Sequence, residues 1–350
     1  MIYSIVIAIF FSIFSLIFTK SKLITILFFI FIWLLMGWNF WNGDYELYKE
    51  MYDYNDASSL IVSNYEFGYK YIMSMFLAKG KDFQYFFTCM SFLILLIFLI
   101  FILKFSKLPA LVTTIFFLIF LPLDYVLLRN TIAFIIMLVA FAYLLKNIKN
   151  NKLIFIILVL LAGTIHFSAF FYIIFLLAFR VTRISVIKVF IAIGVLLILY
   201  IVFKNILYIY FPEVELRSNI YKNTWIMFFL YSTFQIINYF IIKLYTENQL
   251  NQSKTLNINI VIYNINTLLL FLIVFYFDMT IFVRIFRNIA FINIIYMTNF
   301  LYINRRNQRI SMYIAVFIIY LMFFYVTFIL PVLDDSMFAL FKYNLLFRDL

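Results

Sequence analysis

The chain has 350 residues, of which 67% are hydrophobic, 23% aromatic and only 12% charged. Soluble domains are about 45–50% apolar and about 25% charged, so this composition excludes a soluble enzyme, a disordered chain, a collagen-like fibre and a disulfide scaffold. A mean hydropathy of +1.09 leaves an integral membrane protein. The net charge of +12 is spread over short loops between apolar runs, which is typical of membrane topology and not of a nucleic-acid partner.

The apolar runs are about 20 residues long and lack the period-two alternation of barrel strands, so they predict helices. We therefore expect an all-α, polytopic membrane bundle with about ten full spans, forming one integral-membrane domain over residues 1–350. One cysteine and one histidine are too few for a disulfide or for a metal site with the usual ligands, and no cofactor is expected. The predicted spans are residues 2–18, 23–41, 83–103, 108–127, 131–145, 185–203, 224–242, 257–277, 281–303 and 310–330.

The apolar run 153–179 is interrupted around His166. We predict two short helices that enter the membrane and return, with His166 near their tip; a single tilted span is the alternative. With the N-terminus outside, the hairpin places 15 of the 27 cations and one of the 15 acids on the inner side, in agreement with the positive-inside rule. A single crossing would instead place the arginines of residues 305–309 outside.

The longest polar stretch, residues 42–82, lies on the outer side and is expected to carry part of the site. Its second half, 66–77, has the pattern of a short amphipathic helix. The inner loops are short, and with six glycines the chain has no Gly-rich phosphate loop. We therefore expect any chemistry at the outer face, without a bound nucleotide.

Two acids of this stretch are candidate catalytic residues. Asp44, Tyr48 and Tyr52 are spaced four apart and share one helix face; such an acid can accept a proton while the rings stack on sugars, although an aromatic interface belt with a solvated acid is the alternative. Glu66 opens the run Glu66-Phe67-Gly68-Tyr69. A carboxylate at a helix N-terminus is stabilised by the helix dipole, so capping is the alternative role of Glu66.

Cationic residues in or beside the spans are costly and are functional candidates by default. Arg129 lies between two spans at the outer face, where it could clamp a phosphate or pair with Asp124. His166, next to the helix break, could serve as an acid, a base or a phosphate donor, or be a buried histidine satisfied by a backbone carbonyl.

Arg284 and Arg287 are three residues apart and share a helix face, followed by Asn288. Two fixed positive charges that face a bundle interior need an anion, and a pyrophosphate is a natural one. Pairing with Asp278 or Asp124 is the alternative. Together, these residues predict an anionic, lipid-linked ligand at the outer leaflet.

The chain resembles the EpsG family of exopolysaccharide proteins, which is akin to Wzy-type O-antigen polymerases. The resemblance covers roughly residues 40–290. It rests on Gly43-Asp44 with Tyr48 and Tyr52, Tyr65-Glu66-Phe67-Gly68-Tyr69, Leu128-Arg129-Asn130 followed by Ala133, Ile165-His166-Phe167-Ser168, and Arg284.

The resemblance implies a multi-pass enzyme of the bacterial inner (cytoplasmic) membrane, with a GT-C-like bundle. Such an enzyme joins undecaprenyl-pyrophosphate-linked repeat units into O-antigen or exopolysaccharide, and its partners are membrane lipid, a flippase and a chain-length regulator. Applied to this chain, Arg284, Arg287 and Arg129 would hold the donor pyrophosphate, and Asp44 or Glu66 would take the proton of the attacking hydroxyl. His166 would orient the acceptor or donate to the phosphate, and Tyr48, Tyr52 and Tyr69 would contact the glycan.

Rival functions come from several classes of protein. A lipid-linked oligosaccharide flippase also needs cations, but it usually has duplicated halves, and we find no repeat. A glycosyltransferase that adds single sugars is a second rival. A membrane O-acyltransferase with His166 as its base and a non-enzymatic assembly subunit are the third and fourth.

Overall fold

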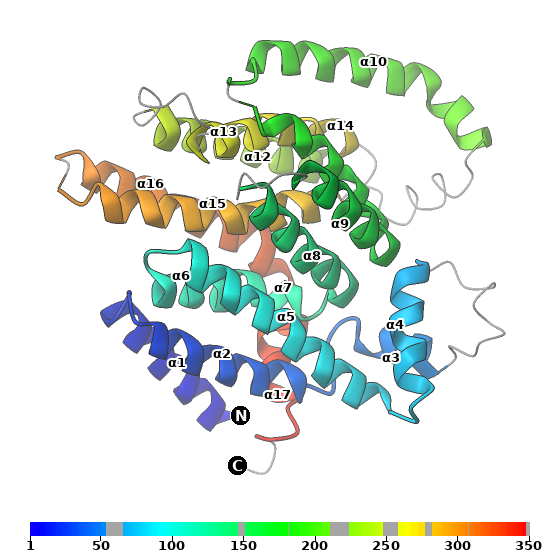
Figure 1. The fold of residues 1–350 in the computed structure, drawn as a ribbon, viewed down its shortest axis with the longest axis vertical. Helices are drawn as coiled ribbons and strands as arrows, with labels where there is room; N and C mark the ends of the chain where they lie inside the picture. Colours follow the sequence, from blue (N-terminus) through cyan, green and yellow to red (C-terminus); the bar gives the residue numbers. More distant parts are fainter. Residues whose placement is uncertain are drawn as a thin grey trace. The chain divides into compact units, whose positions relative to one another are not determined.

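The structure of the chain is a computed structural model that describes residues 1–53, 66–145, 151–180, 182–210, 224–247, 258–276, 282–306 and 308–347. Every regular element of these residues is helical (Figure 1). The elements, with η for 3-10 and π segments, are α1 (Ile2–Ile17), α2 (Lys22–Gly37), α3 (Tyr45–Asp53), α4 (Phe67–Leu77), α5 (Phe83–Phe105), α6 (Pro109–Ile115), η2 (Phe116–Phe120), α7 (Leu121–Asp124), α8 (Leu128–Leu144), α9 (Asn151–Ile165), η3 (Phe167–Ala178), α10 (Val186–Tyr210), α12 (Trp225–Glu247), α13 (Ile258–Leu269), α14 (Leu272–Tyr276), α15 (Val283–Ile303), α16 (Ile310–Phe324), η5 (Tyr325–Ile329), η6 (Leu330–Val332), η7 (Asp334–Phe338) and α17 (Ala339–Lys342).

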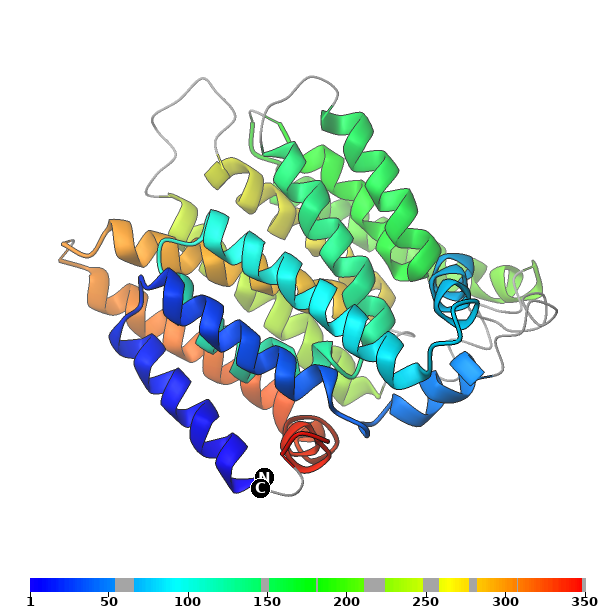
Figure 2. The same ribbon diagram turned by 60° about the horizontal axis from the view of Figure 1, so that its bottom comes forward.

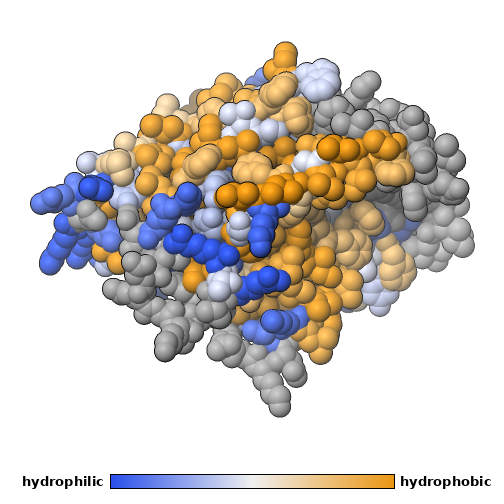
Figure 3. Space-filling view, turned by 90° about the horizontal axis from the view of Figure 1, so that it is seen from above, coloured by the Kyte–Doolittle hydropathy of each residue, from blue (hydrophilic) through white to orange (hydrophobic). Residues whose placement is uncertain are grey.

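These helices confirm the predicted all-α polytopic bundle, and each predicted span coincides with a helix or with a run of joined helices. By length and composition, four are able to cross a membrane: Phe83–Phe105, Trp225–Glu247, Ile258–Tyr276 and Ile310–Val332. The other apolar helices, with α10 counted over Val186–Tyr200, have 10–17 residues, fewer than the roughly 20 that cross a bilayer upright. Apolar side chains cover much of the face in Figure 3, as expected for helices against lipid.

Local sequence explains where several helices begin and bend. Asp82 caps α5 by accepting a hydrogen bond from the Tyr85 backbone N–H at 2.7 Å. Pro122 and Pro331 lie within longer helical runs, where a proline removes one N–H and clashes with the carbonyl four residues earlier. Each proline is the second residue after a π-helical segment, η2 for Pro122 and η5 for Pro331. The wider turn of a π-helix contains one extra residue, which relieves the clash.

The chain divides into two compact units. Unit 1 contains Met1–Ala142, Ile157–Ala169 and Ile294–Leu350, and unit 2 contains Tyr143–Ile156 and Phe170–Asn293. The expectation of a single integral-membrane domain stays a prediction.

Two residues named in the sequence analysis lie outside the described residues. They are Tyr65, which precedes Glu66 in the family motif, and Asp278, the alternative partner of the late arginines.

Unit 1 has its predicted inner loops at one end. The Ala110 N–H donates to the Thr19 carbonyl at 3.0 Å, and Lys20 and Arg305 both approach the ring of Tyr302. A single crossing by residues 153–179 would have placed Arg305 at the other end from Lys20. This contact therefore supports the hairpin.

The predicted outer segments of unit 1 also meet. The Leu345 N–H donates to the Trp38 carbonyl at 3.0 Å, and Gln84 Nε2 donates to the Gly37 carbonyl at 2.8 Å. The amino group of Met1 donates to the Phe347 carbonyl at 3.1 Å, and the start of α1 lies near the red helices that end the chain in Figure 2. The two sets of loops thus separate as the charge pattern predicts.

The hairpin itself is formed by α9 and η3. The rings of Phe155, near the start of α9, and Phe179, just after η3, have centroids 6.5 Å apart. Because these residues lie at opposite ends of the 153–179 run, the chain must fold back between them. The predicted fold-back is observed, and the entry of this hairpin into the membrane stays a prediction.

Unit 2 is held together by a cycle of three buried asparagines from α12, α13 and α15. Asn238 Nδ2 donates to Asn266 Oδ1 at 2.8 Å, Asn266 Nδ2 donates to Asn293 Oδ1 at 2.9 Å, and Asn293 Nδ2 donates back to Asn238 Oδ1 at 3.3 Å. In lipid, where no water competes, such amides join helices together. These asparagines were not among the candidates from the sequence.

We expect Asn266→Leu to lower the free energy of unfolding by about 1–2 kcal/mol, since it removes interhelical hydrogen bonds and leaves Asn238 and Asn293 incompletely paired. Asn304→Leu is the matched control, because Asn304 Nδ2 donates to Phe300 of its own helix. Unfolding in detergent micelles measures both. Equal losses in the two variants would contradict a role of the cycle in joining the helices.

Candidate functional site

The candidate site lies in unit 1 and centres on the carboxylate of Glu66, the residue before α4. Its backbone is extended, and its side chain makes no capping hydrogen bond to α4. Instead, Glu66 Oε2 accepts a hydrogen bond from Arg129 Nη1 at 2.8 Å. The two side chains are 13% and 18% exposed, so this is a largely buried ion pair. The capping alternative for Glu66 is therefore not the arrangement observed, and Arg129 has Glu66 as an ion-pair partner.

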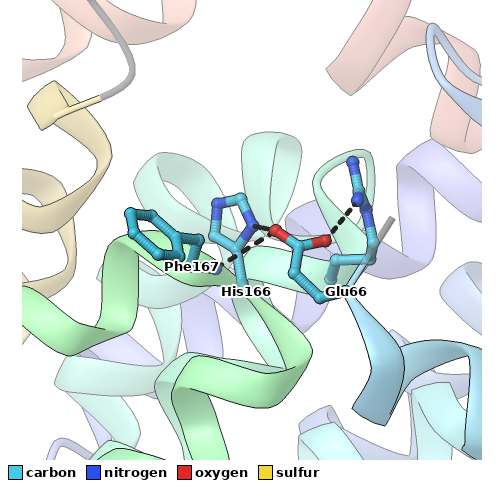
Figure 4. Close-up of polar contacts among 4 residues, drawn as sticks. Glu66, His166 and Phe167 are labelled. Atoms are coloured by element: carbon cyan, nitrogen blue, oxygen red, sulfur yellow. Dashed lines mark hydrogen bonds and ion pairs between the residues drawn. The ribbon is translucent and has the colours of Figure 1, made fainter. Parts of the chain in front are cut away.

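The other carboxylate oxygen faces the tip of the hairpin, as Figure 4 shows. Glu66 Oε1 accepts a hydrogen bond from the Phe167 backbone N–H at 3.1 Å and lies 3.4 Å from His166 Nδ1. His166 is buried and lies where α9 ends and η3 begins. The helix break therefore has a local consequence: it turns both the imidazole and a backbone N–H toward one carboxylate.

A glycine lets α4 approach the hairpin tip. A Cβ atom added at Gly68 would lie 2.4 Å from Thr164 Oγ1 and 2.8 Å from the Thr164 carbonyl oxygen. Real Cβ atoms do not come so close to a backbone atom, so any larger residue would push α4 away from the end of α9. Gly68 is two residues after Glu66, and Thr164 is two residues before His166. The contact thus fixes the distance between the carboxylate and the imidazole.

The three candidate tyrosines are buried, and Tyr48 and Tyr69 lie on the arginine side of the cluster. The Tyr48 ring centroid is 5.8 Å from Arg129 Cζ, a cation–π distance, and 6.0 Å from the ring of Tyr69. Tyr52 donates its hydroxyl hydrogen to the Lys81 carbonyl at 2.8 Å. In the structure these rings pack beside Arg129 and the outer helices, and their contact with a glycan stays a prediction.

Asp44 begins the turn before α3. Its N–H donates to Asn42 Oδ1 at 3.0 Å, and its carbonyl accepts from the Tyr48 N–H at 3.0 Å. The structure thus brings Glu66, Arg129 and His166 into direct contact and places Asp44 one helical turn before Tyr48, which contacts Arg129.

The electrostatics of the cluster favour an ionised Glu66. Burial raises the pKa of its carboxyl group, but the hydrogen bond with His166, the charges of Arg129 and His166 and the Phe167 N–H outweigh burial and lower the pKa to about 2. A carboxylate with so low a pKa is a weak proton acceptor. Its geometry suits it to orienting His166 and Arg129, rather than to the base role considered from the sequence.

This pKa predicts an acid-dependent stability. Because the folded pKa of Glu66 is depressed from 4.5 to about 2, ionised Glu66 contributes stability above pH 4.5 that is lost as the pH falls through about 2. We expect wild type to exceed Glu66→Gln by on the order of 3 kcal/mol in unfolding free energy at pH 6, and this gap to shrink toward pH 2. The exposed Glu50 supplies the control, Glu50→Gln. A gap that does not change with pH would contradict the assignment.

Arg284 and Arg287 lie in the part of α15 that belongs to unit 2. Arg287 is 2% exposed, and the neighbouring Asn288 donates to the Tyr172 hydroxyl at 2.9 Å. Arg284 is half-buried. Of the two late arginines, Arg287 is thus buried and Arg284 is partly exposed, and their role toward an anion stays a prediction. Among the residues that the structure describes, no group of three His, Cys, Asp or Glu side chains could hold a metal ion.

The chain was compared with models of known protein families. A family model described as the EpsG family matches residues 22–345, which is most of the chain and includes every residue of the Glu66 cluster. The chain belongs to the EpsG family. Membership supports a multi-pass membrane protein with a role of the polysaccharide-polymerase type. Searches of curated proteins and of solved structures found no match to this EpsG-family chain.

The residue that sequence reasoning missed in this EpsG-family site is Gly68. It stands within the Glu66-Phe67-Gly68-Tyr69 run, but no role was assigned to it. The sequence does indicate a special role for this glycine, because a glycine in the first turn of a helix lowers helix stability and is usually kept there for close packing. The partner, Thr164, is 96 residues away in sequence and could not have been named.

Proposed function

We propose that this protein is a polymerase that joins undecaprenyl-pyrophosphate-linked oligosaccharide repeat units at the outer face of the bacterial inner membrane. The observation that carries the proposal is the buried Glu66–Arg129–His166 cluster in a multi-pass protein of the EpsG family. A cation can stabilise the charge of a leaving pyrophosphate, and a carboxylate and an imidazole can handle the proton of the acceptor, as transfer from a lipid pyrophosphate needs.

In the proposed reaction, a hydroxyl oxygen of the acceptor sugar attacks the anomeric carbon of the donor. The bond between that carbon and the pyrophosphate oxygen breaks, and the pyrophosphate leaves with the bonding electron pair. Arginines stabilise the charge that develops on the leaving group through their planar forks; the candidates are Arg284 and Arg287 in unit 2, with Arg129 in unit 1 as a further one. No nucleotide sugar takes part.

The acceptor hydroxyl must lose its proton during this step. We assign this to His166, because an imidazole exchanges protons near neutral pH and Glu66 Oε1 lies 3.4 Å from its Nδ1. A carboxylate in this position fixes the orientation of the ring and stabilises its protonated form. Asp44 is the second candidate, and Tyr48, Tyr52 and Tyr69 are proposed to lie along the glycan path. A flippase and a chain-length regulator are the proposed protein partners.

A deletion of the gene in its own host, with the surface glycan separated on a gel, tests the reaction. We expect the ladder of long chains to collapse to a single repeat unit on its acceptor. Loss of every repeat unit, with lipid-linked units accumulating inside, would identify a flippase instead. A retained ladder with altered mobility would identify an enzyme that adds a single sugar or an acyl group.

The late arginines are tested in the same assay. We expect Arg284→Ala and Arg287→Ala each to abolish long chains when supplied to the deletion strain at wild-type protein level, because each removes a charge from the proposed pyrophosphate clamp. Arg180→Ala is the control, since Arg180 is exposed in the same unit. Long chains in both Arg284→Ala and Arg287→Ala would refute the clamp.

A further inference from the structure

The end of unit 1 opposite the Glu66 cluster carries cations that converge on the ring of Tyr302. Lys20 Nζ lies 4.6 Å and Arg305 Cζ 5.3 Å from its centroid, so the two charges are within about 10 Å of each other. Cation–π attraction holds each of them. The positive-inside rule explains the sign of this end of the unit, but it does not require two cations to meet at one ring.

Backbone contacts fix three chain segments around this ring. The Ala110 N–H donates to the carbonyl of Thr19, the residue before Lys20, at 3.0 Å. Asn299, one turn before Tyr302 on α15, accepts from the Lys107 N–H at 2.6 Å and donates to the Phe105 carbonyl at 2.7 Å. Lys107 therefore stands at the same end, and the positions of the cations follow from the backbone.

The surroundings favour an external anion. Segments 19–22, 104–110 and 299–306, which the structure describes in full, contain no Asp or Glu. The side chains of Lys20, Lys107 and Arg305 are exposed and can reach a ligand. Like charges held this close repel one another unless an anion lies among them.

Apolar side chains flank the cations and indicate the source of that anion. Phe18, Leu23 and Ile303 are each more than half exposed and lie within three residues of Lys20 or Tyr302 in sequence. A lipid can place its phosphate among the cations and its acyl chains along this apolar surface, whereas a free phosphate would use only the cations. Basic pockets between spanning helices on the cytoplasmic side bind anionic headgroups in this way.

We infer that Lys20, Lys107 and Arg305, grouped around Tyr302, form a binding site for the phosphate of an anionic phospholipid. Arg305 supplies a planar fork, and the two lysines supply point charges. The site is separate from the Glu66 cluster, and the inference does not depend on the proposed function.

Native mass spectrometry of the purified full-length protein tests this site. The probes are phosphatidylglycerol and phosphatidylcholine with identical acyl chains. We expect tighter binding of phosphatidylglycerol, and binding about 30-fold weaker in Lys20→Gln/Arg305→Gln, because each charge contributes about fivefold. Lys22→Gln/Arg309→Gln removes two other charges from the same side and should change binding less than threefold.

Tyr302 supplies a second set of variants that leaves every charge in place. Tyr302→Phe keeps the ring but loses the hydroxyl that interacts with Lys20, so it should weaken binding of phosphatidylglycerol less than Tyr302→Leu, which also removes the ring. Equal weakening by the two charge pairs would show diffuse surface attraction and overturn the site. Equal binding of phosphatidylcholine would overturn its preference for an anion, and inorganic phosphate that binds as tightly as the lipid would overturn the lipid as its source.

Discussion

Arg129→Ala is expected to abolish long-chain polymer. Arg129 Nη1 lies 2.8 Å from Glu66 Oε2 in a largely buried pair, so the substitution removes both the proposed phosphate clamp and the partner of a buried carboxylate. Leaving such a charge unpaired destabilises a protein by about 3–5 kcal/mol. A single variant could therefore lose activity because it loses protein.

A double-mutant cycle separates these effects. In Arg129→Ala/Glu66→Gln the stranded charge is gone, and we expect the protein level to recover toward wild type while polymer stays absent. Arg129→Lys should also fail, because an ammonium lacks the planar fork of the guanidinium. Immunoblotting and the glycan gel measure the two quantities. Wild-type chain lengths in the double variant would show that the pair serves stability alone.

Gly68→Ala is expected to reduce polymer formation by about 100-fold while the helices of unit 1 remain folded. The added Cβ would lie 2.8 Å from the Thr164 carbonyl oxygen, and a backbone atom cannot rotate away as a flexible side chain can. The displacement of α4 would separate Glu66 from His166 and from the Phe167 N–H, and a misplacement of about 1 Å costs about that factor in rate. Overpacking would add about 1–3 kcal/mol of destabilisation.

Gly194→Ala is the matched control for this substitution. Nothing lies within 4 Å of a Cβ added at Gly194 in α10, and alanine favours a helix interior over glycine by about 1 kcal/mol. We expect Gly194→Ala to keep full activity and to melt at or above the wild-type temperature. Wild-type activity in Gly68→Ala would contradict the positioning role of the Gly68–Thr164 contact.

The class of the protein and the positions of its long apolar helices could be predicted from the amino-acid sequence, whereas the short helices η7 and α17 were not predicted. Apolar runs predicted the apolar helices, and the distribution of cations predicted the fold-back that the Phe155–Phe179 contact shows. These features follow from local physics: burial of backbone polar groups in lipid requires helices, and charge bias decides which loops stay inside. The late arginines could likewise be assigned to a common face from their spacing alone.

Which of the polar residues meet depends on how the helices pack. The sequence offered Asp44 and Glu66 as equal candidates for the base, but the structure pairs Glu66 with Arg129, 63 residues away, and with His166 beyond it. Those contacts lower the pKa of Glu66 and change its expected role from proton acceptor to positioning group. The asparagine cycle and the close contact between Gly68 and Thr164 could not be predicted from the sequence for the same reason. Each depends on distances between helices, which no local pattern of residues specifies.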